Sequence, residues 1–480
     1  MNPVAHSSIA SKPYDQGQPC AEGDAEPTRR LATFAAGLNF EDIPAWLVER
    51  IRLHVLDGIG VCLHGARLPW TRYVADMVLG EGGNPVASLW GYGGETRART
   101  SVTQAVLVNC TAGHAFEMDD IHKESVLHPN SLAVPVAFAL AQALPGITGR
   151  DITTAIVSGY EVGARVGNAA TTALFLNGFH PQGVTGTFVA AATAGRLLGL
   201  DPQAMQHALG IAGSMGAGLM AAQEGAMVKR LHAGRAGQSG VYAALLAKRG
   251  FTGIENILEA DYGGFLSAFA RTPHMERLLE GLGTQWEAGK VGFKMYPNVT
   301  SMHAALDAFR QLQLEHGLQA ADIDRIAVGC GHMTYVHVAW PYRPTSVTAA
   351  QMNLFYGLAV MALRGSLTVD DYDADHIDAP DVMEFMQRIH PFEDERIENR
   401  GPAFRHAATV RVHTRSGMVL SKDVWERRGS PENPVSSQEV EEKFFANVAH
   451  RIPDGAARRI TALAGRLDSL AAIDELTSLL

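Results

Sequence analysis

The chain has 480 residues, more than one simple hydrophobic core usually serves, so we expect at least two domains. Hydrophobic residues make up 46% and charged residues 19%, which is typical of a globular enzyme and argues against disorder. The formal net charge of −10, without a lysine- or arginine-rich block, argues against nucleic acid or an anionic membrane as a partner.

The N-terminal residues and the cysteines indicate the compartment. Residues 1–27 are polar and lack the positive start and apolar run of a signal peptide, so we expect a flexible tail there. No segment reaches the roughly 18 apolar residues that a membrane span needs. The four cysteines form no Cys-x-x-Cys pair, which fits inert thiols in a reducing compartment. We therefore expect a cytoplasmic protein.

Helical periodicity dominates the chain from its first ordered residues. Pro44 opens a helix that Gly65 closes, and a second helix covers residues 71–80. Residues 131–225 are apolar helices rich in small side chains, which predicts the closely packed interior of a helical bundle. Helical periodicity returns at Ser437, and we expect this last segment to pack on the first helices.

After about residue 270 the pattern becomes mixed. Strand-like alternation covers residues 323–328, 408–413 and 418–424, and a turn ending in glycine joins the last two. Helical patterns cover 299–314 and 350–364 in the same region. This part of the chain therefore predicts a smaller α+β domain.

The predicted fold class is mainly α. A large helical domain would combine residues 28–274 and 431–480, so that both ends of the chain build it. Residues 275–430 would form an α+β lid domain.

One stretch, from His114 to Pro129, concentrates ionisable side chains between two almost uncharged segments: Glu117, Asp119, Asp120, His122, Glu124 and His128. Partial desolvation perturbs pKa values, and acid–base chemistry depends on such groups. A helix cap with solvated neighbours is the structural interpretation, and metal binding by the aspartates and histidines is another. A third is an active-site loop in which His128, stiffened by Pro129, moves a proton while Asp119 and Asp120 orient groups.

Three later clusters carry groups that complement this stretch. His180 precedes a predicted helix start near Gly183, a position that suits an anion. Lys229, Arg230, His232 and Arg235 form a run that we place between two buried helices, so they need partners such as Glu224, Asp261 or a ligand carboxylate. Lys294 lies in a turn at the domain junction, and His303 lies on the helix that follows it.

These clusters interrupt otherwise apolar helices, which predicts that they converge at a cleft between the domains. Carboxylates and imidazoles beside lysine and arginine suit proton abstraction next to a carboxylate, because the cations stabilise the developing charge. No nicotinamide or flavin fingerprint is present. We expect neither a metal nor an organic cofactor.

Four motifs, in this order, resemble those of the MmgE/PrpD family, and the similarity runs through about residues 30–475. They are residues 118–122 (MDDIH, with His128–Pro129), 178–187 (GFHPQGVTGT), 229–235 (KRLHAGR) and 294–297 (KMYP). The family includes 2-methylcitrate dehydratase, cis-aconitate decarboxylase and iminodisuccinate epimerase.

The resemblance implies a helical domain built from both chain ends, an α+β lid and a cofactor-independent enzyme, usually a homodimer. The implied substrate is a small di- or tricarboxylic acid. His128, His180, Lys229 and Lys294 fall where decarboxylase-like members have active-site residues.

Three positions depart from the family pattern. Glu117 replaces an aspartate, Ile121 stands where many members have threonine, and Asn298 stands where the decarboxylase has a histidine, which argues against decarboxylation.

The leading hypothesis is a hydro-lyase of the 2-methylcitrate dehydratase type. His128 would be the acid/base, with Asp119, Asp120, His180 and Lys229 completing the catalytic set. The predicted substrate-binding residues are Glu117, Arg230, His232, Lys294 and His303. The alternatives are an epimerase, a decarboxylase and a helical protein that only binds a carboxylic acid.

Overall fold

The computed structural model describes residues 26–92 and 97–480, which are mostly helical with a small mixed sheet. Most of the predicted tail, residues 1–25, lies outside the described residues. Within the described ranges, every helix is too short or too polar to span a bilayer. The mainly helical fold class is confirmed, whereas the domain boundaries remain a prediction.

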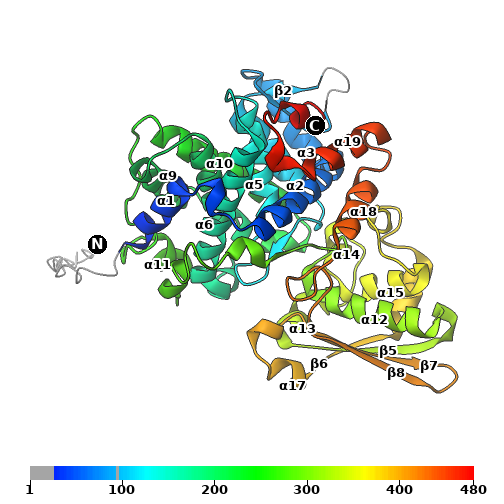
Figure 1. Ribbon diagram of the computed structural model, residues 1–480. Helices are drawn as coiled ribbons and strands as arrows, with labels where there is room; N and C mark the ends of the chain where they lie inside the picture. The colour runs from blue at the N-terminus through cyan, green and yellow to red at the C-terminus, as the bar shows by residue number, and fades with distance from the viewer. Residues whose placement is uncertain (1–25, 93–96) are drawn as a thin grey trace, which may run out of the picture.

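The larger of two hydrophobic cores is surrounded almost entirely by helices (Figure 1). Figure 1 shows the red C-terminal helices beside the blue N-terminal ones, and α18 packs on α2. The main helices of this part are α1 (Pro27–Gly37), α2 (Ala45–Gly65), α3 (Pro69–Glu81), α4 (Val102–Gly113), α5 (Asn130–Ala141), α6 (Gly149–Leu176), α8 (Gly186–Leu197), α9 (Pro202–Ser214), α10 (Val228–Ala247), α18 (Ser437–Val448), α19 (Asp454–Ala464) and α20 (Asp474–Thr477).

Small residues let the central helices of this core approach closely. A Cβ on Gly159 of α6 would lie 2.1 Å from Thr193 Oγ1 of α8. A Cβ on Gly163 would lie 2.2 Å from Val189 Cγ2. Neither distance is sterically possible, so the α6–α8 contact requires glycine at both positions. The predicted close packing of helices in residues 131–225 is confirmed at this contact.

The second core lies beneath a four-stranded mixed sheet in the order β6-β5-β7-β8 (Figure 1). Strands β5 and β6 are parallel, whereas β5–β7 and β7–β8 are antiparallel. Helices α12 and α15 pack on one face, which buries alternate residues of the strands. The elements are β5 (Ile323–Cys330), β6 (Ile389–Glu393), β7 (Ala408–Thr414), β8 (Val419–Val424), α12 (His303–His316), α13 (His332–Val338), α14 (Val347–Gln351), α15 (Leu354–Arg364) and α16 (Pro380–Phe385).

Several elements differ from the sequence prediction. Strand β6 was missed because Pro391 interrupts its pattern, and an edge strand tolerates a proline that a central strand would not. The cationic run 229–235 lies within α10 and not between helices. The prediction failed because the charged residues of the run obscure the helical pattern.

Candidate active site

The ionisable loop, residues 114–129, connects α4 to α5 and is held by two short strands. Strand β3 (Ile121–His122) pairs antiparallel with β4 (Val291–Gly292). The His122 amide donates to the Leu127 carbonyl at 2.8 Å, which closes the turn. Because Lys294 closely follows β4, this pairing brings a cation that is distant in the sequence beside the loop.

Glu117 is the meeting point of three cations. Its carboxylate accepts hydrogen bonds from Lys229 Nζ, from Arg230 Nη1 at 2.6 Å and from Lys294 Nζ at 3.3 Å. Burial alone would raise the pKa of Glu117, but the three cations hold it well below the usual range. The backbone of Glu117 has a φ of 56°, a left-handed conformation that is uncommon outside functional sites.

The cations around Glu117 exceed the available negative charge. Asp119 Oδ1 lies 3.8 Å from Lys294 Nζ, so two carboxylates face three buried cations. Burial lowers the pKa of Lys229 to about 8, although Glu117 opposes the shift. A surplus positive charge in a desolvated site is costly unless an anion joins it. The cluster therefore suits a ligand carboxylate.

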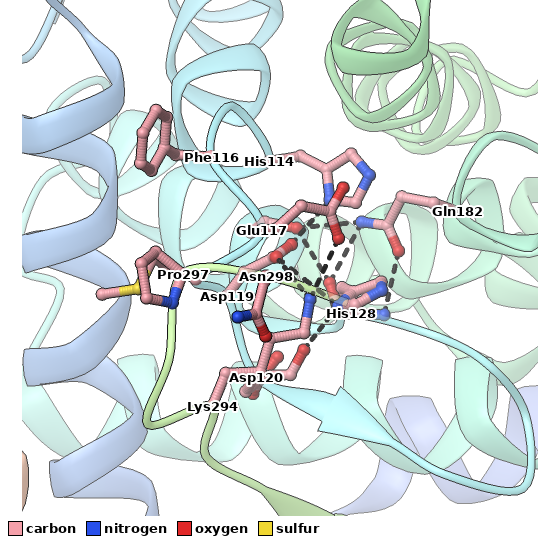
Figure 2. Close-up of polar contacts among 12 residues, drawn as sticks. His114, Phe116, Glu117, Asp119, Asp120, His128, Gln182, Lys294, Pro297 and Asn298 are labelled. Atoms are coloured by element: carbon pink, nitrogen blue, oxygen red, sulfur yellow. Dashed lines mark hydrogen bonds and ion pairs between the residues drawn. The ribbon is translucent and has the colours of Figure 1, made fainter. Parts of the chain in front are cut away.

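His128 is fixed in one orientation with one ring nitrogen free (Figure 2). Its Nδ1–H donates to the Asp120 carbonyl at 2.6 Å, and Gln182 bonds both its backbone amide and its carbonyl. Nε2 makes no hydrogen bond to any described residue. Burial lowers the pKa of His128 to about 3, and Lys294 and His114 reinforce the shift. The imidazole is therefore neutral near pH 7 and has a lone pair available as a base.

The two aspartates of the loop lie behind His128. Asp119 Oδ2 is 2.6 Å from His114 Nδ1, and Asp119 Oδ1 is 3.5 Å from His128 Nδ1. Asp120 turns the other way, and its carboxylate accepts from Tyr160 Oη at 2.9 Å. Both carboxylates are 0% exposed, so they can act on a ligand only through other groups.

His180 caps the short helix α7 (Pro181–Val184) and packs on His232, with the two Nδ1 atoms 2.9 Å apart. One of them must donate and the other accept. Burial and neighbouring cations hold the pKa of His180 well below its ordinary value, and burial lowers the pKa of His232 to about 4. His232 thus backs His180 and fixes its ring.

Five of the predicted residues line one cavity of about 100 Å³, hereafter the polar cavity: Glu117, His128, His180, Lys229 and Lys294. Asp119, Asp120, Arg230 and His232 lie behind this wall and do not line it. His303 is also absent from the lining: it is 0% exposed, and its Nε2 lies 3.2 Å from the Asn298 carbonyl. The helical pattern of α12 alone could not tell which face carries His303.

The lining of the polar cavity also contains polar residues that the sequence analysis missed. Arg405 donates to the Lys123 carbonyl, and burial lowers the pKa of its guanidinium, although Glu124 opposes the shift. Ser301 Oγ lies 3.1 Å from His337 Nδ1, and both side chains line the cavity. Their sequence signal is weak, because Arg405 stands just before β7 and His337 is a lone histidine between valines. Only the fold brings them to the site.

One group of described residues has the composition of a metal site. His114, Asp119 and His128 offer ligand atoms within 4.8 Å of one another. Lys294 Nζ, however, lies 3.8 Å from Asp119 Oδ1. This nearby positive charge fits a metal ion poorly.

Comparison with known proteins places this arrangement in a family. Residues 29–278 match the MmgE/PrpD N-terminal domain, and residues 296–469 match the MmgE/PrpD C-terminal domain. The chain belongs to the MmgE/PrpD family. The predicted membership is therefore confirmed, and the two matches cover every predicted site residue except Lys294, which lies between them.

Three relatives of this MmgE/PrpD protein carry related names. It is 30% identical to the cis-aconitate decarboxylase of Aspergillus terreus, over 94% of this chain and 95% of the relative. It is 30% identical to a cis-aconitate decarboxylase-like protein of Aspergillus oryzae, over 94% and 97% of the two chains. It is 28% identical to the human cis-aconitate decarboxylase, over 94% of each chain.

Proposed function

We propose that this protein is a lyase that removes water from a small hydroxy di- or tricarboxylic acid, as a 2-methylcitrate dehydratase does. The observation that carries the proposal is the pairing of a neutral, oriented His128 with surplus positive charge at Lys229 and Lys294. A base beside a carboxylate-binding cluster is what α-proton abstraction requires.

In the proposed reaction, Lys229 and Lys294 bind a substrate carboxylate and His128 Nε2 removes the proton from the adjacent carbon. The electron pair passes into the carboxylate, where the cations stabilise the enediolate-like charge. Asp119, 3.5 Å from His128 Nδ1, stabilises the imidazolium that forms. The C–O bond of the β-hydroxyl then breaks, and Lys229, with its pKa lowered to about 8, supplies the proton that turns the leaving hydroxide into water.

Decarboxylation is the second candidate, and the names of the relatives favour it. Loss of CO₂ needs a proton donor to carbon and no base. His128 is poorly suited to that role, because its only N–H is bonded to the Asp120 carbonyl. An epimerase, which removes and returns the same proton, would use the same base.

Proton NMR in deuterated water separates these reactions. Citrate, 2-methylcitrate, malate, tartrate and cis-aconitate are each incubated with the enzyme. We expect an alkene signal from a hydroxy acid, and a rate about 10²–10⁴-fold lower in His128→Asn. Release of CO₂ from cis-aconitate without dehydration of any hydroxy acid would establish the decarboxylase instead. Deuterium at the α-carbon without an alkene would establish the epimerase.

A further inference from the structure

Arg405 brings a further positive charge to the polar cavity, from the segment that precedes β7. Its guanidinium donates to the Lys123 carbonyl and to His406 Nε2 at 3.4 Å, but it forms no ion pair with a carboxylate of a described residue. Lys123 also lines the cavity, and Glu426 at 3.4 Å and Glu432 at 3.7 Å balance its charge. Within the described part of the chain, Arg405 is therefore a lining cation without a balancing carboxylate.

His406, which also lines the cavity, carries an N–H that lacks an acceptor. An arginine Nε–H can only donate, so His406 Nε2 accepts from Arg405 and the neutral ring carries its proton on Nδ1. Burial, reinforced by Arg405 and Arg427, holds the pKa of His406 well below its ordinary value, so the ring is neutral near pH 7. Nδ1 is buried and has no hydrogen-bond partner among the residues that the structure describes. Such a donor is costly to leave unpaired, and an oxygen of a ligand would satisfy it.

His337 of α13 is held near this pair and adds a second nitrogen. Thr334 Oγ1, one turn earlier on α13, donates to the Arg405 carbonyl at 2.6 Å. Ser301 Oγ lies 3.1 Å from His337 Nδ1 and can donate to it, which leaves the ring proton on Nε2. His337 Nε2 is also buried, and no residue in the described ranges is bonded to it. Arg405, His406 and His337, hereafter the Arg405 site, all come from the part of the chain that builds the second core.

Lys229 and Lys294 bind Glu117 and line the same polar cavity as the Arg405 site. A ligand carboxylate at the two lysines would leave the charge of Arg405 unbalanced and the histidine donors without acceptors. A second carboxylate on the same ligand supplies two oxygens and the missing negative charge. An acid with a single carboxylate would leave these groups unsatisfied, and that cost lowers its affinity.

We propose that Arg405 and His406 are specificity-determining residues, which bind a second carboxylate of the substrate while Lys229 and Lys294 bind the first. His337 Nε2 provides a further donor to the second carboxylate. This inference rests on the proposed function, because it takes the carboxylate at the two lysines from that proposal. Its new content is the Arg405 site, which selects against acids that carry only one carboxylate.

Two ligands that differ by one carboxylate test the inference without turnover. Titration calorimetry compares glutarate with pentanoate, in which a methyl group replaces one carboxylate of the same chain. Weak binding is measured by displacement of tricarballylate, a tricarboxylic acid with no hydroxyl to eliminate. Charge-assisted hydrogen bonds at the Arg405 site should make glutarate bind at least about ten-fold more tightly than pentanoate.

Arg405→Gln should remove most of that gain and leave pentanoate binding unchanged. Arg411→Gln is the matched control, because it removes the same charge from an exposed position on β7 that does not line the polar cavity, and it should preserve the gain. His406→Leu is a second variant, which removes the Nδ1 donor and keeps the bond from Arg405 to the Lys123 carbonyl. It should weaken glutarate binding about two- to ten-fold and leave pentanoate binding unchanged.

Each contrary outcome has a defined meaning. Equal binding of glutarate and pentanoate by the unaltered protein overturns the inference and leaves the proposed function standing. Unchanged glutarate binding in Arg405→Gln overturns it as well. So does an equal fold loss of both acids, which would show a general change in the cavity and no contact with one carboxylate. An equal loss of glutarate binding in Arg411→Gln would attribute the effect to long-range charge and also overturn it. If neither acid nor tricarballylate binds the unaltered protein, the proposed function fails together with the inference.

Discussion

Two buried polar clusters include residues of the 114–129 loop, and they differ in whether they face a cavity. The front cluster, Glu117 with Lys229, Arg230 and Lys294, faces the polar cavity and has more cations than carboxylates. An enzyme site tolerates such an imbalance when a ligand completes it.

The rear cluster contains Asp57, Asp120, Asn130, Tyr160 and Lys443, which are all buried and do not line the polar cavity. Lys443 of α18 lies 2.6 Å from Asp57 Oδ1 and donates to the Met118 carbonyl at 2.7 Å. Asn130 bonds both Asp57 and Asp120, and Tyr160 bonds Asp120. Each carboxylate has hydrogen-bond partners inside the protein and faces no cavity, so this cluster stabilises the loop and does not contact a ligand.

The comparison teaches that burial alone does not identify the reacting groups. Asp119 and Asp120 are neighbours in sequence and equally buried, but only the side-chain carboxylate of Asp119 lies near His128 Nδ1 and Lys294 Nζ. The following variants separate the chemical role of the front cluster from the structural role of the rear one.

The largest effect is expected from His128→Asn. Losing a general base costs about 10²–10⁴-fold in rate. The asparagine amide can still donate to the Asp120 carbonyl, so the loop should remain folded. Initial rates on the substrate found by NMR measure the loss, and thermal melting checks the fold. Unchanged turnover would remove His128 from the mechanism.

The next effect concerns stability and the rear cluster. Lys443→Met leaves the buried Asp57 carboxylate without its cation and should cost about 3–5 kcal/mol. Urea denaturation measures the change in the free energy of unfolding. Lys422→Met is the control, because Lys422 pairs with Glu315 at the surface and its loss should be much smaller. Equal losses in both variants would contradict the structural role of Lys443.

Glu117→Gln should lower stability less, by about 1–3 kcal/mol, because Lys229 and Lys294 line the polar cavity, where water or an anion can replace the lost carboxylate. Added tricarballylate should restore part of this loss by binding to them. The same ligand should stabilise Lys443→Met no more than it stabilises the unaltered protein. Melting curves with and without tricarballylate measure both effects. Failure of the ligand to stabilise Glu117→Gln would contradict the anion-binding role of the front cluster.

The smallest effect is a pH dependence at Asp120. Burial raises its pKa to about 7, above the ordinary value of 3.8 that we take for the unfolded chain. The folded state therefore holds this proton more tightly than the unfolded chain. As a result, the contribution of Asp120 to the free energy of unfolding falls as the pH rises from about 4 to about 7. Asp120→Asn lacks this loss, so its melting temperature should fall less than that of the unaltered protein between pH 5 and pH 8. Asp324→Asn, at an exposed position, should behave like the unaltered protein. The same pH dependence of the melting temperature in the unaltered protein and in both variants would contradict the raised pKa of Asp120.

Much of the site could be predicted from the sequence, because its residues occur in compact motifs between apolar helices. His128, His180, Lys229 and Lys294 all line the polar cavity, as their motifs predicted. The partners suggested for the cationic run 229–235 were Glu224, Asp261 or a ligand carboxylate, whereas Glu117 binds Lys229 and Arg230. That contact depends on where α10 crosses the 114–129 loop, which no local pattern encodes.

Long-range placement explains the remaining differences. The two-residue strands β3 and β4 bring Lys294 to the loop, and strands of this length leave no periodicity to detect. Arg405 lies on the segment before β7 and His337 lies on α13, so tertiary packing and no local pattern brings them to the cavity. His303 is an ionisable residue close in sequence to Lys294, as a site residue would be, but it lies on the buried face of α12. Side-chain direction, and not residue type, decided these cases.

The most direct test of carboxylate binding by the front cluster is titration calorimetry of tricarballylate with the unaltered protein and with Lys294→Met. Removing one cation from a cluster with surplus positive charge should leave the fold intact, because Lys229 and Arg230 still neutralise Glu117. We expect saturable binding that weakens as salt concentration rises, and at least about ten-fold weaker binding by Lys294→Met. Absence of binding, or equal binding by both proteins, would contradict a carboxylate site at this cluster.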